Sequence, residues 1–125
     1  MLLDASPTTW PATVCSVPAY EPVCAVFHDP SQGAERLDVF PAFAAVSKIS
    51  SLGHVPMAVV TAAHRVDPTL ATDELARLDS VWGEGMKRWA GLSSSSKIVT
   101  VEHTGHHIEL DQPQTVLREL LELLP

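Results

Sequence analysis

The sequence contains few basic residues: its 125 residues include 8 Lys and Arg against 15 Asp and Glu, a formal net charge of −7. Nucleic-acid-binding proteins contact phosphates through clustered Lys and Arg, whereas the 8 basic residues here are scattered. The composition therefore argues against nucleic acid as a partner, and equally against an anionic membrane surface. Because no apolar run approaches the roughly 18 residues that span a bilayer, we expect no membrane partner.

The first ten residues are not expected to form a secretion signal, and the sequence has little cysteine. Its first ten residues, MLLDASPTTW, have no basic segment before a short apolar run that stops at Asp4. We therefore expect a cytoplasmic protein. Cys15 and Cys24 lie nine residues apart in a proline-rich stretch. A disulfide is possible there, but two reduced thiols are the favoured interpretation.

The overall composition is typical of a globular domain, with 46% hydrophobic and 18% charged residues. A length of 125 residues suits one domain, spanning 1–125, and is too short for two. Strand-like apolar runs lie at 1–3, 57–63 and 97–102, and helical patterns lie at 38–53, after 68 and after 113. Because strands that alternate with helices form right-handed crossovers, we expect an α/β fold with about three parallel strands covered by helices.

Prolines and glycines modify this pattern. Prolines recur in the first forty residues, and proline blocks helix interiors, so we expect an irregular insert over about 15–35. Gly83 and Gly85 are expected to kink or end the helix that follows residue 68. The apolar residues of that helix are expected to form one stripe: Leu75, Leu78, Trp82, Met86 and Trp89. Asp111 is expected to cap the last helix. The apolar positions of that helix share one face: Val116, Leu117, Leu120, Leu121 and Leu124.

The strongest functional signal is the segment VEHTGHHIELDQP, residues 101–113. A strand ends here, Gly105 permits a tight turn, and His106 lies at the carboxyl edge of the expected sheet, where ligands and catalytic groups collect in open parallel sheets. The apolar Ile108 then turns back inward. This segment resembles the histidine loop of α/β-hydrolases, in which Gly-His follows the last strand and a D-x-P sequence begins the last helix.

The resemblance extends upstream in chain order. "WAGLSSSS" is similar to the stretch before the final strand of these enzymes, "VPMAVVTAA" to their penultimate strand, and "LLDASPTTW" to the strand after the nucleophile's helix. Each motif is short, and their order carries the resemblance over residues 1–14 and 36–125. The stretch 15–35 falls where the family inserts a variable lid. The resemblance implies the C-terminal part of an α/β-hydrolase fold and an esterase-like or lipase-like activity.

In that family the catalytic triad runs in chain order Ser, Asp or Glu, His, so the resemblance implies His106 as the general base. Two carboxylates compete for the acid. Asp67 follows the penultimate strand, as is usual in the family, whereas Asp4 ends the preceding strand, as in lipase-like members. This choice stays open. His107 is expected to point elsewhere and His103 to face solvent.

The serine nucleophile is missing, because no G-x-S-x-G sequence occurs in the 125 residues. Ser93 to Ser96 lack the pair of glycines and a preceding strand, and Ser6 is followed by proline, which has no N–H to offer an oxyanion. We therefore expect a chain that begins about one helix after the serine and is inactive alone. It is either part of a working hydrolase of small-molecule esters or acyl compounds, or a non-catalytic binding module or relic.

The remaining expectations concern ligands and association. Histidines and glutamates near the loop offer possible metal ligands, but zinc sites on helices use i, i+4 histidines, whereas these lie on a strand end and a turn. We therefore expect no metal and no cofactor. Self-association through an exposed sheet edge is expected, since the family's nucleophile strand would pair beside residues 1–3. The possible metal ligands near the loop are Glu102, His103, His106, His107, Glu109 and His64.

Overall fold

The computed structural model describes residues 1–29, 31, 36–63 and 69–124, and confirms a parallel α/β arrangement. Its sheet has three strands in the order β1 (Leu2–Leu3), β2 (Met57–Ala62) and β3 (Ser96–Val101). Both pairings are parallel, with Leu2 opposite Val59 and Met57 opposite Ser96. All carboxyl ends of the strands therefore meet at one edge of the sheet.

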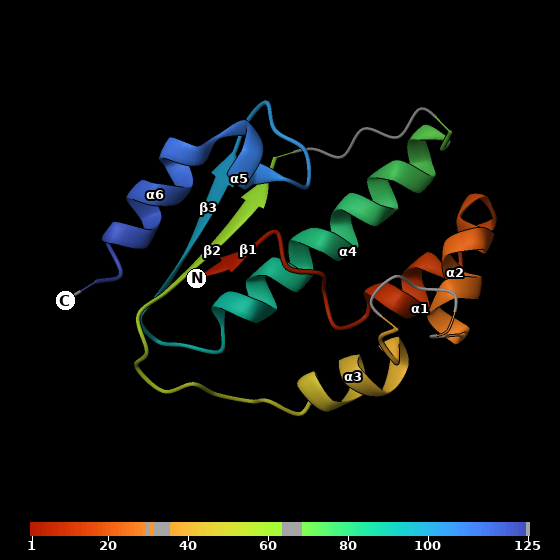
Figure 1. The fold of residues 1–125 in the computed structure, drawn as a ribbon, viewed down its shortest axis with the longest axis horizontal. Coiled ribbons are helices and arrows are strands. Elements are labelled where there is room, and N and C mark those ends of the chain that lie inside the picture. The colour runs from red at the N-terminus through yellow and green to blue at the C-terminus, as the bar shows by residue number, and fades with distance from the viewer. Residues whose placement is uncertain (30, 32–35, 64–68, 125) are drawn as a thin grey trace.

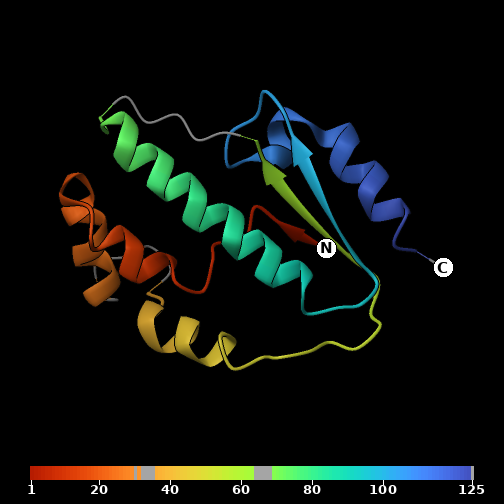
Figure 2. The ribbon, with the colours of Figure 1, turned by 180° about the vertical axis from the view of Figure 1, so that it is seen from behind.

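Helices cover the sheet on both faces (Figures 1 and 2). Helix α4 (Thr72–Ala90) packs on one face, and the short α5 (Ile108–Asp111) with α6 (Pro113–Leu121) packs on the other. Side chains alternate along β2, so Met57 and Val59 meet α4 while Ala58 and Val60 meet the α5 side. The central strand is thus buried on both faces, which explains its continuous apolar run.

Helix α4 runs through both of its central glycines, so the expected kink or early end was wrong. A glycine inside a helix costs only about 1 kcal/mol, which the burial of the apolar residues of α4 offsets. Gly85 also leaves room for the buried Pro7, which packs directly on the helix. A Cβ built at Gly85 would lie 2.4 Å from the ring of Pro7. Gly83 meets nothing within 4 Å. Of the expected apolar stripe, Leu75 is only partly buried, and four residues are buried: Leu78, Trp82, Met86 and Trp89.

The stretch 15–35, which was expected to be irregular, contains the 3₁₀ turn η1 (Pro18–Tyr20) and helix α2 (Glu21–His28). Helix α1 (Trp10–Val14) directly precedes it. Each has a proline in its first turn, at Pro11, Pro18 and Pro22. Proline lacks an N–H that the first turn leaves unpaired anyway, so these prolines begin helices instead of preventing them.

The helix expected to reach Gly53 is shorter. Helix α3 (Val39–Val46) ends at Val46, and the next apolar residue of the pattern, Ile49, is exposed. We call residues 10–46, which carry α1, α2 and α3, the helical arm. The arm lies beyond α4, on the side away from α6, in both views (Figures 1 and 2).

A disulfide joins Cys15 to Cys24 within the arm, so the favoured interpretation of two reduced thiols was wrong. Cys15 follows the last residue of α1 and Cys24 lies in α2. The chain reverses direction between the two short helices, and the Cα atoms of Cys15 and Cys24 lie 4.9 Å apart. This separation lies within the range that a disulfide requires. Disulfides persist mainly in oxidising compartments, and the cytoplasmic location stays a prediction.

Candidate active site

Asp4 begins the site at the carboxyl end of β1. Its backbone N–H donates to the Val60 carbonyl at 2.7 Å, which continues the pairing of β1 with β2. Its φ of 40° lies in the left-handed region, which aspartate tolerates better than most residues. This turn directs the carboxylate along the sheet edge, and the residue is 3% exposed. A buried carboxylate needs hydrogen-bond donors to offset the loss of water.

Those donors come from β2 and α4. Oδ1 of Asp4 accepts from the Thr61 hydroxyl at 3.1 Å, the Ala62 backbone N–H at 3.3 Å and Trp82 Nε1 at 3.2 Å. Trp82 Nε1 also lies 3.2 Å from the Thr61 hydroxyl oxygen. One oxygen of the carboxylate is therefore held by two chain segments far from Asp4 in sequence. Oδ2 is left to bind another group.

That group is His106, whose Nδ1 lies 2.8 Å from Oδ2. The two residues are 102 positions apart, and they meet because both follow parallel strands of one sheet. An ionised carboxylate only accepts hydrogen bonds, so it selects the imidazole tautomer that carries its proton on Nδ1. Nε2 then presents a lone pair. The side chain is 62% exposed, and no hydrogen bond of Nε2 occurs among the residues that the structure describes.

Aromatic rings surround the pair from the α4 side. Trp82 lies edge-on to the His106 imidazole, with ring centroids 6.5 Å apart. Trp10 of α1 packs edge-on against Trp82 at 4.9 Å. Trp10 of the helical arm therefore packs on Trp82, and it is Trp82 that donates to Asp4. Sequence reasoning placed Trp82 only in an apolar stripe and missed this polar role, since nothing in the spacing distinguishes it from a core residue.

The loop that carries His106 is braced by Asp111. Its Oδ2 accepts from the Thr104 hydroxyl and from the Gly105 N–H, both at 3.0 Å. The Gly105 N–H, followed by the Thr104 hydroxyl, lowers the pKa of the Asp111 carboxyl below its usual value. Asp111 was expected to cap the last helix, but Gln112 occupies the N-cap of α6 and Asp111 ends α5. The carboxylate is used to hold the turn instead.

Ile108 anchors the far side of the same loop. Its side chain is 0% exposed and packs with Ala58, Val60 and Val101, as the sequence predicted. His107 lies beside it with Nδ1 3.2 Å from Glu109 Oε1, pointing to a different partner from His106. His103 is exposed and has a φ of 56°. Asp67 and His64 lie outside the described residues, so their placement relative to His106 is not part of this geometry.

A pocket of about 250 Å³ lies between α4 and strands β2 and β3. Thr61 and Trp82, two of the residues that bind Asp4, line it. His106 does not. Its other walls combine apolar residues with polar and charged ones: Ala62, Ala63, Met86 and Ile98 with Asp79, Lys87 and Thr100. A hollow with both apolar and charged walls thus lies beside Thr61 and Trp82, the residues that bind the buried acid.

No protein-family model, curated protein sequence or solved structure matches this chain. Among the described residues, no helix is both long enough and apolar enough to cross a membrane. The strand pairing and the Asp4–His106 contact define the chain as a parallel α/β fold in which a buried aspartate is paired with a loop histidine.

Proposed function

We propose that this chain carries the acid and base of an α/β-hydrolase-type triad, in an enzyme that cleaves ester or acyl bonds of small molecules. Asp4 is the acid and His106 the general base. The nucleophilic serine comes from a segment outside these 125 residues, because they contain no G-x-S-x-G sequence. No cofactor takes part in this chemistry.

The observation that carries the proposal is the 2.8 Å contact between Asp4 Oδ2 and His106 Nδ1. A buried carboxylate that holds one imidazole nitrogen, while the other nitrogen faces solvent, is the arrangement that activates a serine hydroxyl. The order of the strands also fits, since both residues follow parallel strands at one edge. The Asp4 contact favours the lipase-like position of the acid over Asp67.

In the proposed reaction, Nε2 of His106 takes the proton of the serine hydroxyl as the hydroxyl oxygen attacks the acyl carbon. Nε2 then returns this proton to the leaving alcohol. Asp4 stays ionised, holds the tautomer and stabilises the imidazolium that forms between these steps. The three donors on Oδ1 keep the carboxylate from turning away from the ring.

The test begins with the 125-residue chain alone. We expect it to hydrolyse p-nitrophenyl esters no faster than free imidazole, since loss of the serine costs about 10⁴–10⁶ in kcat. A fluorophosphonate should leave it unlabelled. Burst kinetics or covalent labelling would show that the chain contains a nucleophile and would overturn the division of roles proposed here.

The second step joins the chain to an α/β-hydrolase N-terminal half that ends in its nucleophile elbow. Activity should appear, and His106→Ala should abolish it. His107→Ala is the matched control, because this neighbouring imidazole pairs with Glu109 and should be dispensable. If several such halves fold with the chain and none gains activity, the catalytic role is wrong and the non-catalytic interpretation stands.

A further inference from the structure

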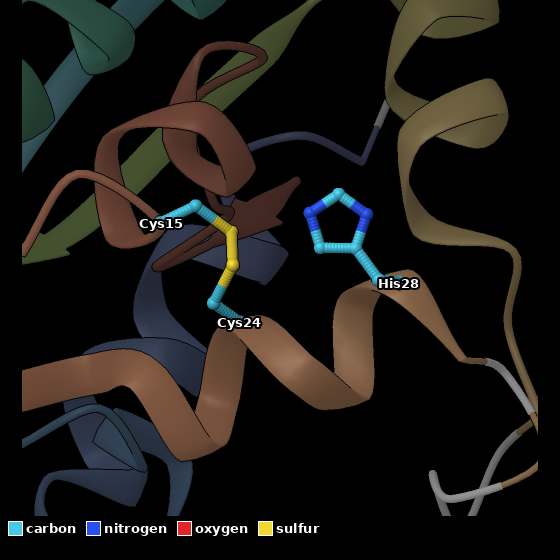
Figure 3. Close-up of side chains that lie close together, drawn as sticks. All are labelled: Cys15, Cys24 and His28. Atoms are coloured by element: carbon cyan, nitrogen blue, oxygen red, sulfur yellow. A yellow bond between two sulfur atoms is a disulfide. The ribbon is translucent and has the colours of Figure 1, made fainter.

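Three side chains of metal-binding type gather in the helical arm, away from Asp4 and His106. The sulfur atoms of Cys15 and Cys24 and a ring nitrogen of His28 all lie within 4.8 Å of one another. Cys24 and His28 are four residues apart in α2, so they share one face of that helix. Figure 3 shows the His28 imidazole beside the disulfide, with Cys15 reaching the pair from the end of α1.

This donor set matches the preferences of zinc. Zn²⁺ binds cysteine thiolates and histidine nitrogens tetrahedrally, and sites with two cysteines and one histidine leave the fourth position to water or substrate. The disulfide, however, excludes a metal, because its sulfur atoms are uncharged and bonded at about 2.0 Å. Two thiolates on one zinc ion lie about 3.8 Å apart, from Zn–S bonds of about 2.3 Å in a tetrahedron. The oxidised and metal-bound states are therefore alternatives.

We propose that Cys15, Cys24 and His28 form a metal site that takes Zn²⁺, or a cation of similar ligand preference, only after the Cys15–Cys24 disulfide is reduced. The movement required is small. The sulfur atoms must separate by about 2 Å, and the sulfur and nitrogen atoms must come to about 3.6 Å from one another. Cα atoms 4.9 Å apart allow rotation of the cysteine side chains to supply most of this change.

The chemistry balances with a dithiol as reductant. The dithiol transfers two electrons and two protons to the Cys15–Cys24 bond and becomes a disulfide itself, while two thiols form on the protein. Zn²⁺ then displaces the two thiol protons and binds the thiolates and the neutral imidazole. Because the metal binds only the reduced form, it stabilises that form by mass action and slows its reoxidation.

The surroundings are compatible with access and with orientation of the ligands. His28 is exposed and both cysteines are partly exposed, so an ion and a reductant can reach them from solvent. The Phe40 ring of α3 packs against the His28 imidazole with centroids 4.7 Å apart, which restricts rotation of the imidazole. A net charge of −7 favours the approach of a cation.

Co²⁺ provides the test, because thiolate coordination gives it a strong ultraviolet charge-transfer absorption and tetrahedral geometry gives it visible bands. The full chain, reduced with a phosphine, should bind one Co²⁺, and excess Zn²⁺ should displace it. The oxidised chain should show neither absorption. His28→Ala should weaken binding at least tenfold, whereas His103→Asn, at an exposed histidine outside the arm, should leave it unchanged.

Alkylation supplies a second measurement that does not depend on cobalt spectra. Zn²⁺ should slow maleimide labelling of both thiols in the reduced chain, and His28→Ala should remove most of this protection. The proposal is wrong if the reduced chain binds metal no more tightly than the Cys15→Ser/Cys24→Ser variant, or if His28→Ala binds as the unmodified chain does. It is equally wrong if reduction abolishes the circular dichroism of the helices and Zn²⁺ fails to restore it.

Discussion

The sheet and the helical arm are held together by different forces. The central strand β2 is buried on both faces, and two apolar clusters join it to α4 and to α5. In the arm, burial is uneven: α1 has two buried residues, Pro11 and Val14, and α3 has one, Val39, whereas α2 has none. What α2 has instead is a disulfide to the end of α1. The sheet is stabilised by removing apolar surface from water, whereas α2, which buries no residue, is joined to the end of α1 by a covalent bond.

This difference determines how firmly each region holds the side chains of its site. Asp4 and His106 stand on the buried region, where non-local hydrogen bonds fix the carboxylate and Ile108 anchors the loop. The cysteines and His28 stand on short helices with little burial, where a change in a single bond can alter the local arrangement. A rigid site suits proton transfer, whereas an adaptable one suits a change of ligand state.

The largest expected effect is on the rigid site. In the active fusion described above, Asp4→Asn should lower the rate by about 10⁴, because the amide no longer selects the required tautomer of His106. Asparagine tolerates the left-handed backbone at this position, so thermal unfolding should change little. Asp67→Asn is the matched control and should keep near-normal activity. The opposite pattern would assign the acid to Asp67.

The next effect tests the burial contrast directly. Ile108→Ala should reduce the free energy of unfolding by about 2–4 kcal/mol, because it empties a fully buried position in the cluster beneath the histidine loop. Val23→Ala, at a side chain 45% exposed on α2, should change it by less than about 0.5 kcal/mol. Urea unfolding measures both. Equal losses of unfolding free energy would mean that Val23 contributes to the core as much as Ile108 does.

The disulfide should matter mainly within the arm. Cys15→Ser/Cys24→Ser removes a cross-link between residues nine apart. Because the cross-link lowers the entropy of the unfolded chain, its loss should cost about 2–3 kcal/mol of stability in the arm. We expect faster amide hydrogen exchange in α2 and unchanged protection in β2 and β3. Uniform acceleration across the sheet would contradict the separation of the two regions, since it would require the disulfide to stabilise the core.

Alanine substitutions at the two glycines of α4 test the contact between this helix and Pro7. Gly85→Ala should destabilise the protein by about 1–3 kcal/mol, because the new methyl group collides with the buried Pro7 ring. Gly83→Ala should stabilise it by up to about 1 kcal/mol, since a Cβ there meets nothing within 4 Å and alanine favours helix. Melting temperatures of the two variants should therefore move in opposite directions.

The smallest expected effect depends on pH. Glu119 is buried in α6, and its Oε2 lies 2.6 Å from Lys97 Nζ of β3. This contact with the Lys97 ammonium lowers the pKa of Glu119 below its usual value, against the opposing effect of burial. The stabilisation is therefore present above the unfolded pKa of about 4.3 and is lost as the pH falls through the lower folded pKa.

Glu119→Gln should accordingly cost about 1 kcal/mol at neutral pH and progressively less in acid. Urea unfolding of both proteins at pH 7 and at pH 3 measures the difference. Glu122→Gln is the control, because Glu122 also pairs with Lys97 but is 53% exposed and should contribute less at either pH. A cost that does not change with pH would show that the ion pair is not its source.

Much of the fold could be predicted because it depends on short-range patterns. The apolar run at 57–63 predicted a buried strand, and the spacing of Leu78, Trp82, Met86 and Trp89 predicted the buried face of α4. The proline-rich segment was misjudged, because proline prevents or begins a helix according to its position in the turn. The apolar face expected for the last helix does not form part of the core, because Leu117, Leu120, Leu121 and Leu124 are exposed.

The sequence by itself determined the alternation of strands and helices, the turn that carries His106 and the inward position of Ile108, since each follows from local spacing. Only the tertiary structure brought Asp4 to His106, aimed Trp82 Nε1 at the carboxylate and joined Cys15 to Cys24 beside His28. These contacts depend on which strands are neighbours and on how helices return along the chain. A one-dimensional pattern records which residues can make a hydrogen bond or a disulfide, and the packed chain selects which of them meet.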